Sequence, residues 1–266
     1  MQTHAKHRVE HWAQNAQNIS ALNLIAEEPL SIRVQGHSYA VVMRTPGEER
    51  AHVAGLCLTE GIVDTPEDLV SIAFCDGHDT NVVAVTLTSA RREMMDDILN
   101  RRAFISQTRC GICGQDIIRD LRSFVSPMSG GPRIPLEAAM RCFDALSEQQ
   151  ALRRETVASH AAAVFDSNLT LLAAGEDVGR HNALDKVIGK LFLDRRLSQA
   201  CVLVLSSRVS YELVQKAARA RIPIVLAVSR PTTLAVEMTA QLNMTLAGLA
   251  RDGGLFVFCG GQRLQA

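Results

Sequence analysis

The second half of the chain alternates short apolar runs with amphipathic segments, and this alternation constrains the fold more than any other feature. The apolar runs cover residues 201–205, 224–228 and 255–259. Between them, apolar residues recur at three- and four-residue spacing over 213–217 and 234–242, which is typical of one helix face. Apolar runs joined by such helices indicate strands that are buried on both faces of a sheet. We therefore predict a layered α/β domain with a mostly parallel sheet.

The first half of the chain carries a different pattern. Apolar and polar residues alternate on both sides of Gly36, from Ile32 to Met43, which predicts a β-hairpin. A helix is expected next, ending at Gly61. Residues 123–135 contain three prolines and two glycines, and this composition is typical of a linker.

These patterns predict three parts. Residues 1–20 are rich in His, Gln and Asn and are expected to form a flexible tail. Residues 21–127 are expected to form a small N-terminal α+β domain that carries a Cys-x-x-Cys loop. Residues 128–266 are expected to form the C-terminal α/β domain.

Composition excludes several classes of protein. Lys plus Arg is 28 and Asp plus Glu is 28, so the chain lacks the strongly basic character of a nucleic-acid binder. The apolar runs are far shorter than the ~18 residues that a membrane-spanning helix needs. The N-terminus has no apolar segment of a secretory signal, so we expect a cytoplasmic protein. The seven cysteines are expected to be thiols there, without a disulfide framework.

The sharpest local motif is the pair of thiols at Cys110 and Cys113, in the sequence Cys-Gly-Ile-Cys-Gly. Arginines precede the motif, and nearby positive charge lowers the pKa of a thiol and favours the nucleophilic thiolate. A reactive thiol is therefore the favoured interpretation. A zinc site remains open, with His160 or His181 as a further ligand, although a second Cys-x-x-Cys motif is missing. A thioredoxin-like exchanger fits less well because the motif follows a polar loop.

Two further regions are rich in polar residues beside apolar ones. The stretch 176–186 contains Arg180, His181 and Asn182 just before a helical stripe; it could hold a phosphate, or it could be a helix cap with Asn182 as the N-cap. The loops 206–212 and 229–233 follow predicted strands and are rich in Ser, Thr and Arg. Ligands bind at the carboxyl ends of strands in α/β sheets, so we expect an anion site there.

These motifs, in this order, resemble the family of formate dehydrogenase accessory sulfurtransferases (FdhD) from about residue 28 to the C-terminus. The matching pieces are Thr45-Pro46, Gly55-Leu56, Thr59-Glu60-Gly61, the motif 110–114, His160-Ala161-Ala162, the stretch 176–186, the segments 208–212 and 231–235, and Thr245-Leu246-Ala247-Gly248 with Arg251. One departure is Val157, which stands in a position where the family pattern has glycine.

The resemblance implies a sulfur relay. A cysteine desulfurase would load sulfane sulfur onto Cys110 as a persulfide, and Cys113 would assist its transfer. The acceptor would be the molybdenum bis(molybdopterin guanine dinucleotide) cofactor of formate dehydrogenase, held as a bound substrate. The C-terminal domain would resemble the cytidine deaminase fold, without deaminase zinc chemistry, because His-x-Glu and Pro-Cys-x-x-Cys are missing. We therefore expect a sulfurtransferase with no resident metal.

The cofactor-binding segment of the family falls on one short stretch of this chain. Its residues are Leu249, Ala250, Arg251, Asp252, Gly253 and Gly254. Within it, Arg251 supplies a cation, and Gly253 and Gly254 let backbone amides approach a phosphate. The expected partners are the desulfurase, formate dehydrogenase and a second copy in a homodimer. Two other interpretations stay open: a non-catalytic chaperone that binds the molybdenum cofactor, and a zinc-binding regulatory module.

Overall fold

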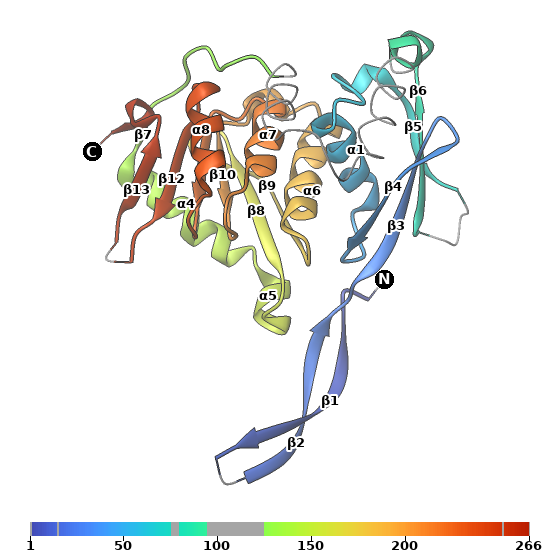
Figure 1. Cartoon of the computed structure of the whole chain (residues 1–266), viewed down its shortest axis with the longest axis vertical. Coiled ribbons are helices and arrows are strands. Elements are labelled where there is room, and N and C mark those ends of the chain that lie inside the picture. The colour runs from blue at the N-terminus through green and yellow to red at the C-terminus, as the bar shows by residue number, and fades with distance from the viewer. Residues whose placement is uncertain (1, 15, 76–79, 95–124, 252, 266) are drawn as a thin grey trace, which may run out of the picture.

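A computed structural model describes residues 2–14, 16–75, 80–94, 125–251 and 253–265 (Figure 1). The described part contains a large sheet and a small sheet, with helices packed between them. The α/β class predicted for the second half is confirmed. Cys110 and Cys113 lie outside the described residues.

The large sheet has six strands, and two of the runs predicted to be strands, 201–205 and 224–228, lie at its centre. In spatial order the strands are β13 (Leu255–Cys259), β12 (Thr245–Leu249), β11 (Ile224–Ala227), β10 (Val202–Leu205), β8 (His160–Phe165) and β9 (Leu171–Asp177). Strands β10, β11 and β12 run parallel, whereas the other three pairings are antiparallel. The prediction of a mostly parallel sheet is therefore wrong. Hairpin turns too short for a crossover connect β8 to β9 and β12 to β13, and such turns force antiparallel pairing.

Helices cover both faces of this sheet. One face packs against α6 (Arg180–Leu193), α7 (Tyr211–Arg219) and α8 (Thr233–Gln241), and the other against α4 (Leu136–Glu148). The parallel strands β10 and β11 are buried along their whole length because helices cover them on both sides. The shorter elements of this half are β7 (Ile134–Pro135), α5 (Ala151–Thr156), the 3-10 turns Leu197–Gln199 and Gly261–Arg263, and β14 (Leu264–Gln265).

The small sheet belongs to the first half of the chain. It has the strand order β4 (His37–Arg44), β3 (Glu28–Val34), β6 (Val82–Leu87) and β5 (Leu69–Phe74), with a 3-10 turn at Pro66–Asp68. The hairpin predicted around Gly36 is the β3–β4 pair. Helix α1 (Glu49–Thr59) covers this sheet and packs on α6.

Helices α1 and α6 approach so closely that their backbones touch. A side chain at Gly55 would collide with the backbone of Asp185, and one at Gly189 would collide with the backbone of Ala51. The two halves therefore share one hydrophobic core, which runs from the small sheet through these helices to the large sheet. The division into domains at residue 127 stays a prediction. The predicted linker does lack helix and strand over residues 125–133.

The N-terminal segment is a long hairpin, where the sequence predicts a flexible tail over residues 1–20. Strands β1 (His4–Ala13) and β2 (Ala16–Ile25) pair along their full length. That prediction is wrong because backbone pairing does not require apolar side chains, and residues 4–25 contain no Gly or Pro that would interrupt a strand. Across the part of the chain that the structure describes, no helix is long and apolar enough to cross a membrane.

Candidate functional site

The candidate site is one edge of the large sheet, where the carboxyl ends of β10, β11 and β12 meet. The loops that follow β10 and β11 lie side by side, since the backbone amide of Thr232 donates to the carbonyl of Val209 at 2.9 Å. Strand β8 runs antiparallel to β10, so it begins at this edge with His160, which lies opposite Asp177 at the end of β9. The two loops predicted to form an anion site are thus brought together.

Each of four loops at this edge presents an arginine. Arg180 follows β9, Arg208 follows β10, Arg230 follows β11, and Arg251 follows β12. Arg180 is half-buried and the other three are exposed. Helices α6, α7 and α8 also begin at this edge, and a helix N-terminus carries partial positive charge. Together these groups favour an anionic ligand with several negative charges.

Two acidic side chains near these loops, Glu176 and Glu212, bind groups other than the four arginines. Glu176 accepts hydrogen bonds from the backbone amides of Leu152 and Arg153 at 2.7 and 2.9 Å, which caps the start of α5. Glu212 pairs with His181 at 3.0 Å. Among the described residues, neither carboxylate forms an ion pair with one of these arginines. The Nε atom of Arg180 is buried without a hydrogen-bond partner among the described residues, and a bound anion would satisfy it.

Two histidines at the edge are held toward the neutral form. Burial lowers the pKa of His160, and the cations of Arg180 and Arg153 lower it further. Burial also lowers the pKa of His181, although the nearby Glu212 carboxylate opposes this. Neutral imidazoles can donate one hydrogen bond and accept another, so both rings can contact a polar ligand.

The predicted cofactor segment is the turn between β12 and β13. The amide of Ala250 donates to the carbonyl of Gly254 at 3.0 Å, and the amide of Gly253 donates to Ala250 at 3.3 Å. Gly253 and Gly254 have φ angles of 84° and 93°, and a Cβ at either position would meet open space. Leu249 ends β12, and Asp252 lies outside the described residues. The turn thus offers glycine backbone and the Arg251 side chain to a ligand.

An aromatic ring lies next to this turn. The guanidinium carbon of Arg230 lies 5.4 Å from the ring centre of Phe256, whose side chain is half-exposed on β13. A cation over an aromatic face is a favourable arrangement and keeps both groups at the edge. Phe256 is not among the residues predicted from the sequence, because a phenylalanine in the apolar run 255–259 is expected to be a core residue.

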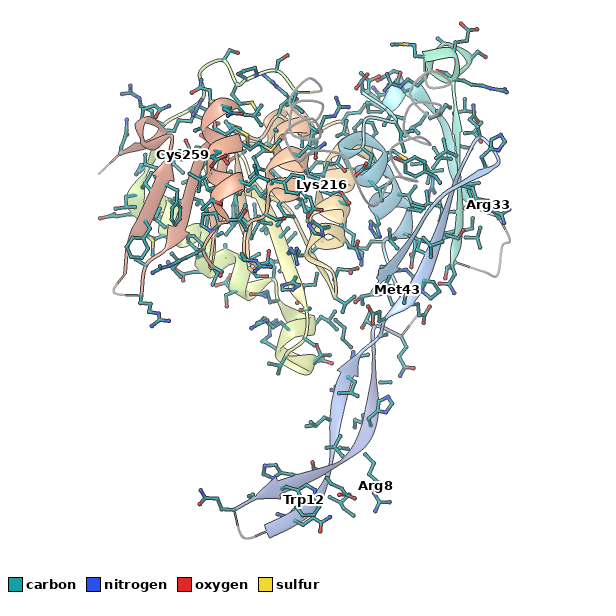
Figure 2. The ribbon with its side chains drawn as sticks, in the orientation of Figure 1. Arg8, Trp12, Arg33, Met43, Lys216 and Cys259 are labelled. Atoms are coloured by element: carbon teal, nitrogen blue, oxygen red, sulfur yellow. The ribbon has the colours of Figure 1, made fainter. Side chains whose placement is uncertain are left out.

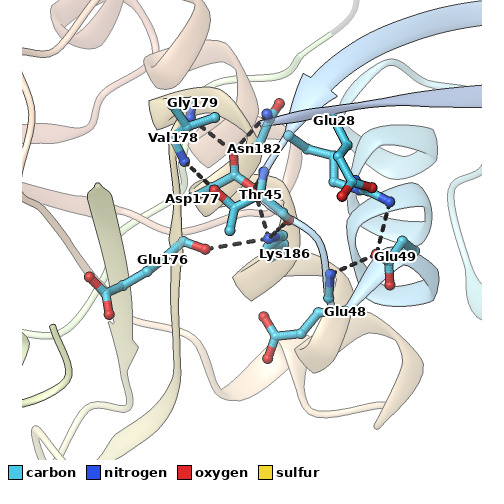
Figure 3. Close-up of polar contacts among 12 residues, drawn as sticks. Glu28, Thr45, Glu48, Glu49, Glu176, Asp177, Val178, Gly179, Asn182 and Lys186 are labelled. Carbon is cyan, nitrogen blue, oxygen red and sulfur yellow. Dashed lines mark hydrogen bonds and ion pairs between the residues drawn. The ribbon is translucent and has the colours of Figure 1, made fainter. Parts of the chain in front are cut away.

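In the polar stretch 176–186, Arg180 and His181 are partly exposed, whereas other residues are buried. Figure 3 shows the buried residues Asp177, Asn182 and Lys186. The Asn182 amide donates to the carbonyl of Met43 at 2.7 Å and to Oδ1 of Asp177 at 2.9 Å. Lys186 lies 2.7 Å from the Asp177 carboxylate and donates to the carbonyl of Thr45 at 2.9 Å. These groups join the second half to the β4–α1 connection.

Asn182 has neither of the roles considered from the sequence, which were a phosphate contact and the N-cap of the helix. Gly179, not Asn182, is the N-cap of α6, and the helix begins at Arg180. Asn182 is 9% exposed and its amide is bound to protein groups, so it does not contact a phosphate. The physical reason is that a buried carboxylate at Asp177 needs donors, and Asn182 is within reach of it.

A second buried ion pair lies where α1, α6 and α7 meet. Nζ of Lys216 lies 2.8 Å from Oδ2 of Asp185 and 2.9 Å from the hydroxyl of Thr59, which itself donates to Asp185. His52 of α1 is fully buried nearby. Burial lowers the pKa of His52 to about 3, and the cations of Lys186, Lys216 and Arg44 contribute.

The predicted catalytic residues Cys110 and Cys113 lie outside the described residues. Apolar neighbours in the sequence predict that Cys57, Cys75, Cys142, Cys201 and Cys259 are small core residues. Burial raises the pKa of Cys57 to about 12 and of Cys142 and Cys201 to about 11, which suits that prediction. Cys75 is exposed, so that prediction is wrong for Cys75. Within the described residues, no group of three or more His, Cys, Asp or Glu side chains is placed to hold a metal ion.

Val157, beside the edge, has the backbone conformation of a glycine. Its φ angle is 58°, and a β-branched residue is strained in this left-handed region. The side chain is 76% exposed, so packing does not compensate for the strain. The position therefore keeps a glycine-like conformation although valine replaces the glycine of the family pattern.

Comparison with known proteins is consistent with these features. The profile of the FdhD/NarQ family matches residues 25–265, and the chain belongs to this family. A sulfur carrier protein FdhD of Mycolicibacterium paratuberculosis is 36% identical over 273 residues, which cover 99% of this chain and all of the relative. A sulfur carrier protein FdhD of Streptomyces coelicolor is 38% identical over 252 residues, which cover 91% of this chain and 88% of the relative.

A solved structure supports the fold. The crystal structure of a Desulfotalea psychrophila protein, described as a formate dehydrogenase accessory protein, superimposes with a TM-score of 0.79. The match covers 99% of this chain and 100% of that protein at 20% sequence identity. At that identity the likeness concerns the fold alone.

Proposed function

We propose that this protein is a sulfur carrier that serves formate dehydrogenase. The observation that carries the proposal is the edge of the large sheet, where four arginines and three helix N-termini lie on adjacent loops. Membership of the FdhD/NarQ family and relatives named as sulfur carriers support the same function. The sulfur would travel on Cys110.

The proposed reaction has two steps at the thiols. The Cys110 thiolate attacks the outer sulfur of a persulfide on a cysteine desulfurase, so that Cys110 gains a sulfur atom and the donor cysteine leaves as a thiolate. Cys113 then attacks the inner sulfur of Cys110 and releases the outer one as hydrosulfide. The product is a disulfide between Cys110 and Cys113, which small cellular thiols reduce. This cycle suits the reducing cytoplasm, where we place the protein.

The proposed acceptor is the molybdenum bis(molybdopterin guanine dinucleotide) cofactor, bound as a substrate at the arginine-rich edge. Its pyrophosphates carry the charge that Arg180, Arg208 and Arg251 can bind in bidentate fashion. The turn 249–254 offers open backbone at Gly253 and Gly254, and the Arg230–Phe256 pair offers a flat surface for a ring. The edge has the charge and the open backbone that such a ligand requires. The expected similarity of this domain to the cytidine deaminase fold stays part of the proposal.

Intact-mass spectrometry tests the carrier chemistry directly. The protein is incubated with a cysteine desulfurase and cysteine, and we expect a gain of one sulfur atom that maps to Cys110. Cys110→Ala should abolish the gain. Cys75→Ala is the matched control, because it removes an exposed thiol elsewhere and should leave the loading intact.

Formate dehydrogenase activity distinguishes the carrier from a chaperone. In cells that depend on this protein, Cys110→Ala should leave formate dehydrogenase inactive. Full activity with the Cys110→Ala protein would overturn the sulfur relay and favour a protein that only binds and delivers the cofactor.

A further inference from the structure

One residue of the first half of the chain, Thr45, is bonded to the region where α6 begins. It directly follows β4, and Met43, which is labelled in Figure 2, lies two residues before it. Each of its three polar groups binds the second half of the chain. Its amide donates to Oδ2 of Asp177 at 3.1 Å, and its hydroxyl oxygen accepts from the amide of Val178 at 3.0 Å. Its carbonyl accepts from Lys186 at 2.9 Å.

The partners of Thr45 form or hold the short loop that precedes α6. This loop consists of Val178 and Gly179, and Arg180 begins the helix. Oδ1 of Asp177 accepts from the amide of Gly179 at 2.8 Å, while its other oxygen binds Thr45. The backbone amides of both loop residues are therefore fixed, one by the Thr45 hydroxyl and the other by the Asp177 carboxylate.

The turn that contains Thr45 is in turn bonded to the small sheet. Arg44, immediately before Thr45, is fully buried and lies 3.1 Å from the Glu49 carboxylate. Glu49 also accepts from the amide of Gly47 at 2.6 Å, and Arg44 donates to Asn81, next to β6, at 2.7 Å. A continuous series of polar contacts thus runs from the small sheet through this turn to the start of α6.

We propose that Thr45 is a positioning residue for the anion site, because it holds the loop that places Arg180 and His181 at the edge of the large sheet. This inference rests on the proposed function of that edge. Thr45 is 2% exposed and Asp177 is fully buried, so neither can contact a ligand. Nε of Arg180 is buried without a hydrogen-bond partner in the described part of the chain, so its placement depends on the backbone. A group that is held in place before binding loses less entropy when the ligand arrives.

Thr59 provides a matched control, because it is an equally buried threonine of the same half of the chain. It is 2% exposed, and its hydroxyl donates to Asp185 at 2.9 Å and accepts from Lys216 at 2.9 Å. These bonds join α1 to α6 and α7 without involving the loop 178–179. A threonine that only joins the two halves would behave like Thr59, whereas a positioning residue also changes the affinity for a ligand.

Isothermal titration of the full-length protein with guanosine diphosphate compares three variants. Thr45→Val removes the acceptor of the Val178 amide at nearly constant volume, and we expect the dissociation constant to rise at least ~5-fold. Thr45→Ser keeps the hydroxyl and should bind within about 2-fold of the wild type. Thr59→Val should also bind like the wild type, although both valine variants should lower the midpoint of thermal unfolding.

Hydrogen exchange of the wild type adds a measurement that needs no variant. If Thr45 strengthens ligand binding through the loop, the ligand must stabilise the bonds of Thr45 by the same factor. Guanosine diphosphate should therefore slow exchange in peptides that contain Thr45 or Val178 more than in a peptide that contains Thr59.

Each outcome decides the inference. Equal affinities of Thr45→Val and the wild type overturn the positioning role, and so do equal losses of affinity in Thr45→Val and Thr59→Val. A failure of Thr45→Ser to bind like the wild type also overturns it. If Thr45→Val does not fold, the exchange comparison decides, and equal protection at Thr45 and Thr59 overturns the role. A wild type that does not bind guanosine diphosphate would instead overturn the anion site itself, and the positioning role with it.

Discussion

Two regions of the protein are rich in cationic side chains, which are buried and paired in one region and exposed in the other. Between α1 and α6, the cations of Lys186 and Lys216 are buried, and each lies within 2.8 Å of a carboxylate. At the carboxyl edge of the large sheet, Arg208, Arg230 and Arg251 are exposed. The first region satisfies its charges internally, whereas the second leaves them available to a ligand.

The comparison shows how one polar stretch can serve both regions. Arg180 and His181 at the start of α6 lie at the edge, whereas Asn182, Asp185 and Lys186 are buried between the helices. Helical geometry separates them, because residues three and four apart share a face while direct neighbours do not. The stretch therefore fixes α6 against the first half of the chain and presents its N-terminus to the ligand.

The largest expected effect comes from breaking a buried pair. Lys216→Met leaves the Asp185 carboxylate buried without its cation, and we expect the free energy of unfolding to fall by about 3–5 kcal/mol. Arg208→Met is the matched control at the edge and should change stability by less than about 0.5 kcal/mol. Urea unfolding followed by circular dichroism measures both values.

A further variant tests the cause of that loss. When Asp185→Leu is combined with Lys216→Met, both charges are removed, and most of the lost stability should return. Equal stability losses in Lys216→Met and Arg208→Met would contradict the distinction between the two regions.

The sequence predicts the strands of this architecture better than the function of its polar residues. Strands β10 and β11 are predicted because a strand buried on both faces must be apolar along its length. Strand β12 escapes prediction because Thr245 and Gly248 interrupt its apolar pattern. The β1–β2 hairpin escapes prediction because its side chains are largely polar and exposed.

The direction in which each polar side chain points could not be predicted, because it depends on tertiary packing. Asn182 is buried because α1 and α6 touch at Gly55 and Gly189, which are 134 residues apart in the chain. Local spacing contains no information about that approach. The proximity of the loops 206–212 and 229–233 was predictable because strand direction alone places their ends on one edge.

A smaller effect is expected from the edge arginines, and it concerns affinity. Arg180→Ala and Arg251→Ala each remove a charged donor, which is worth about 1.5–3 kcal/mol in a hydrogen bond to an anion. Isothermal titration with guanosine diphosphate, which carries the base and phosphates of the proposed ligand, should show at least ~10-fold weaker binding for each variant.

Controls separate this effect from folding. Arg196→Ala removes an exposed arginine after the end of α6 and should leave the affinity unchanged. The stability of Arg180→Ala and Arg251→Ala should stay within about 0.5 kcal/mol of the wild type. If they bind the nucleotide as tightly as Arg196→Ala, the edge is not the anion site.

The smallest expected effect is the contribution of the buried His52 to the pH dependence of stability. His52 has its pKa lowered to about 3 by burial, with Lys186, Lys216 and Arg44 adding to the effect. Below the ordinary histidine pKa, the unfolded chain binds a proton that the folded protein does not, so stability falls as the pH falls toward 3. His52 should contribute a slope of about 1.4 kcal/mol per pH unit in that window.

Urea unfolding between pH 7 and pH 5 measures this slope in the free energy of unfolding. The slope should be lost in His52→Met. It should remain in the control His37→Met, which removes an exposed ring. Parallel curves for the wild type and His52→Met would mean that His52 is protonated in the fold, and the buried region would then hold an additional cation.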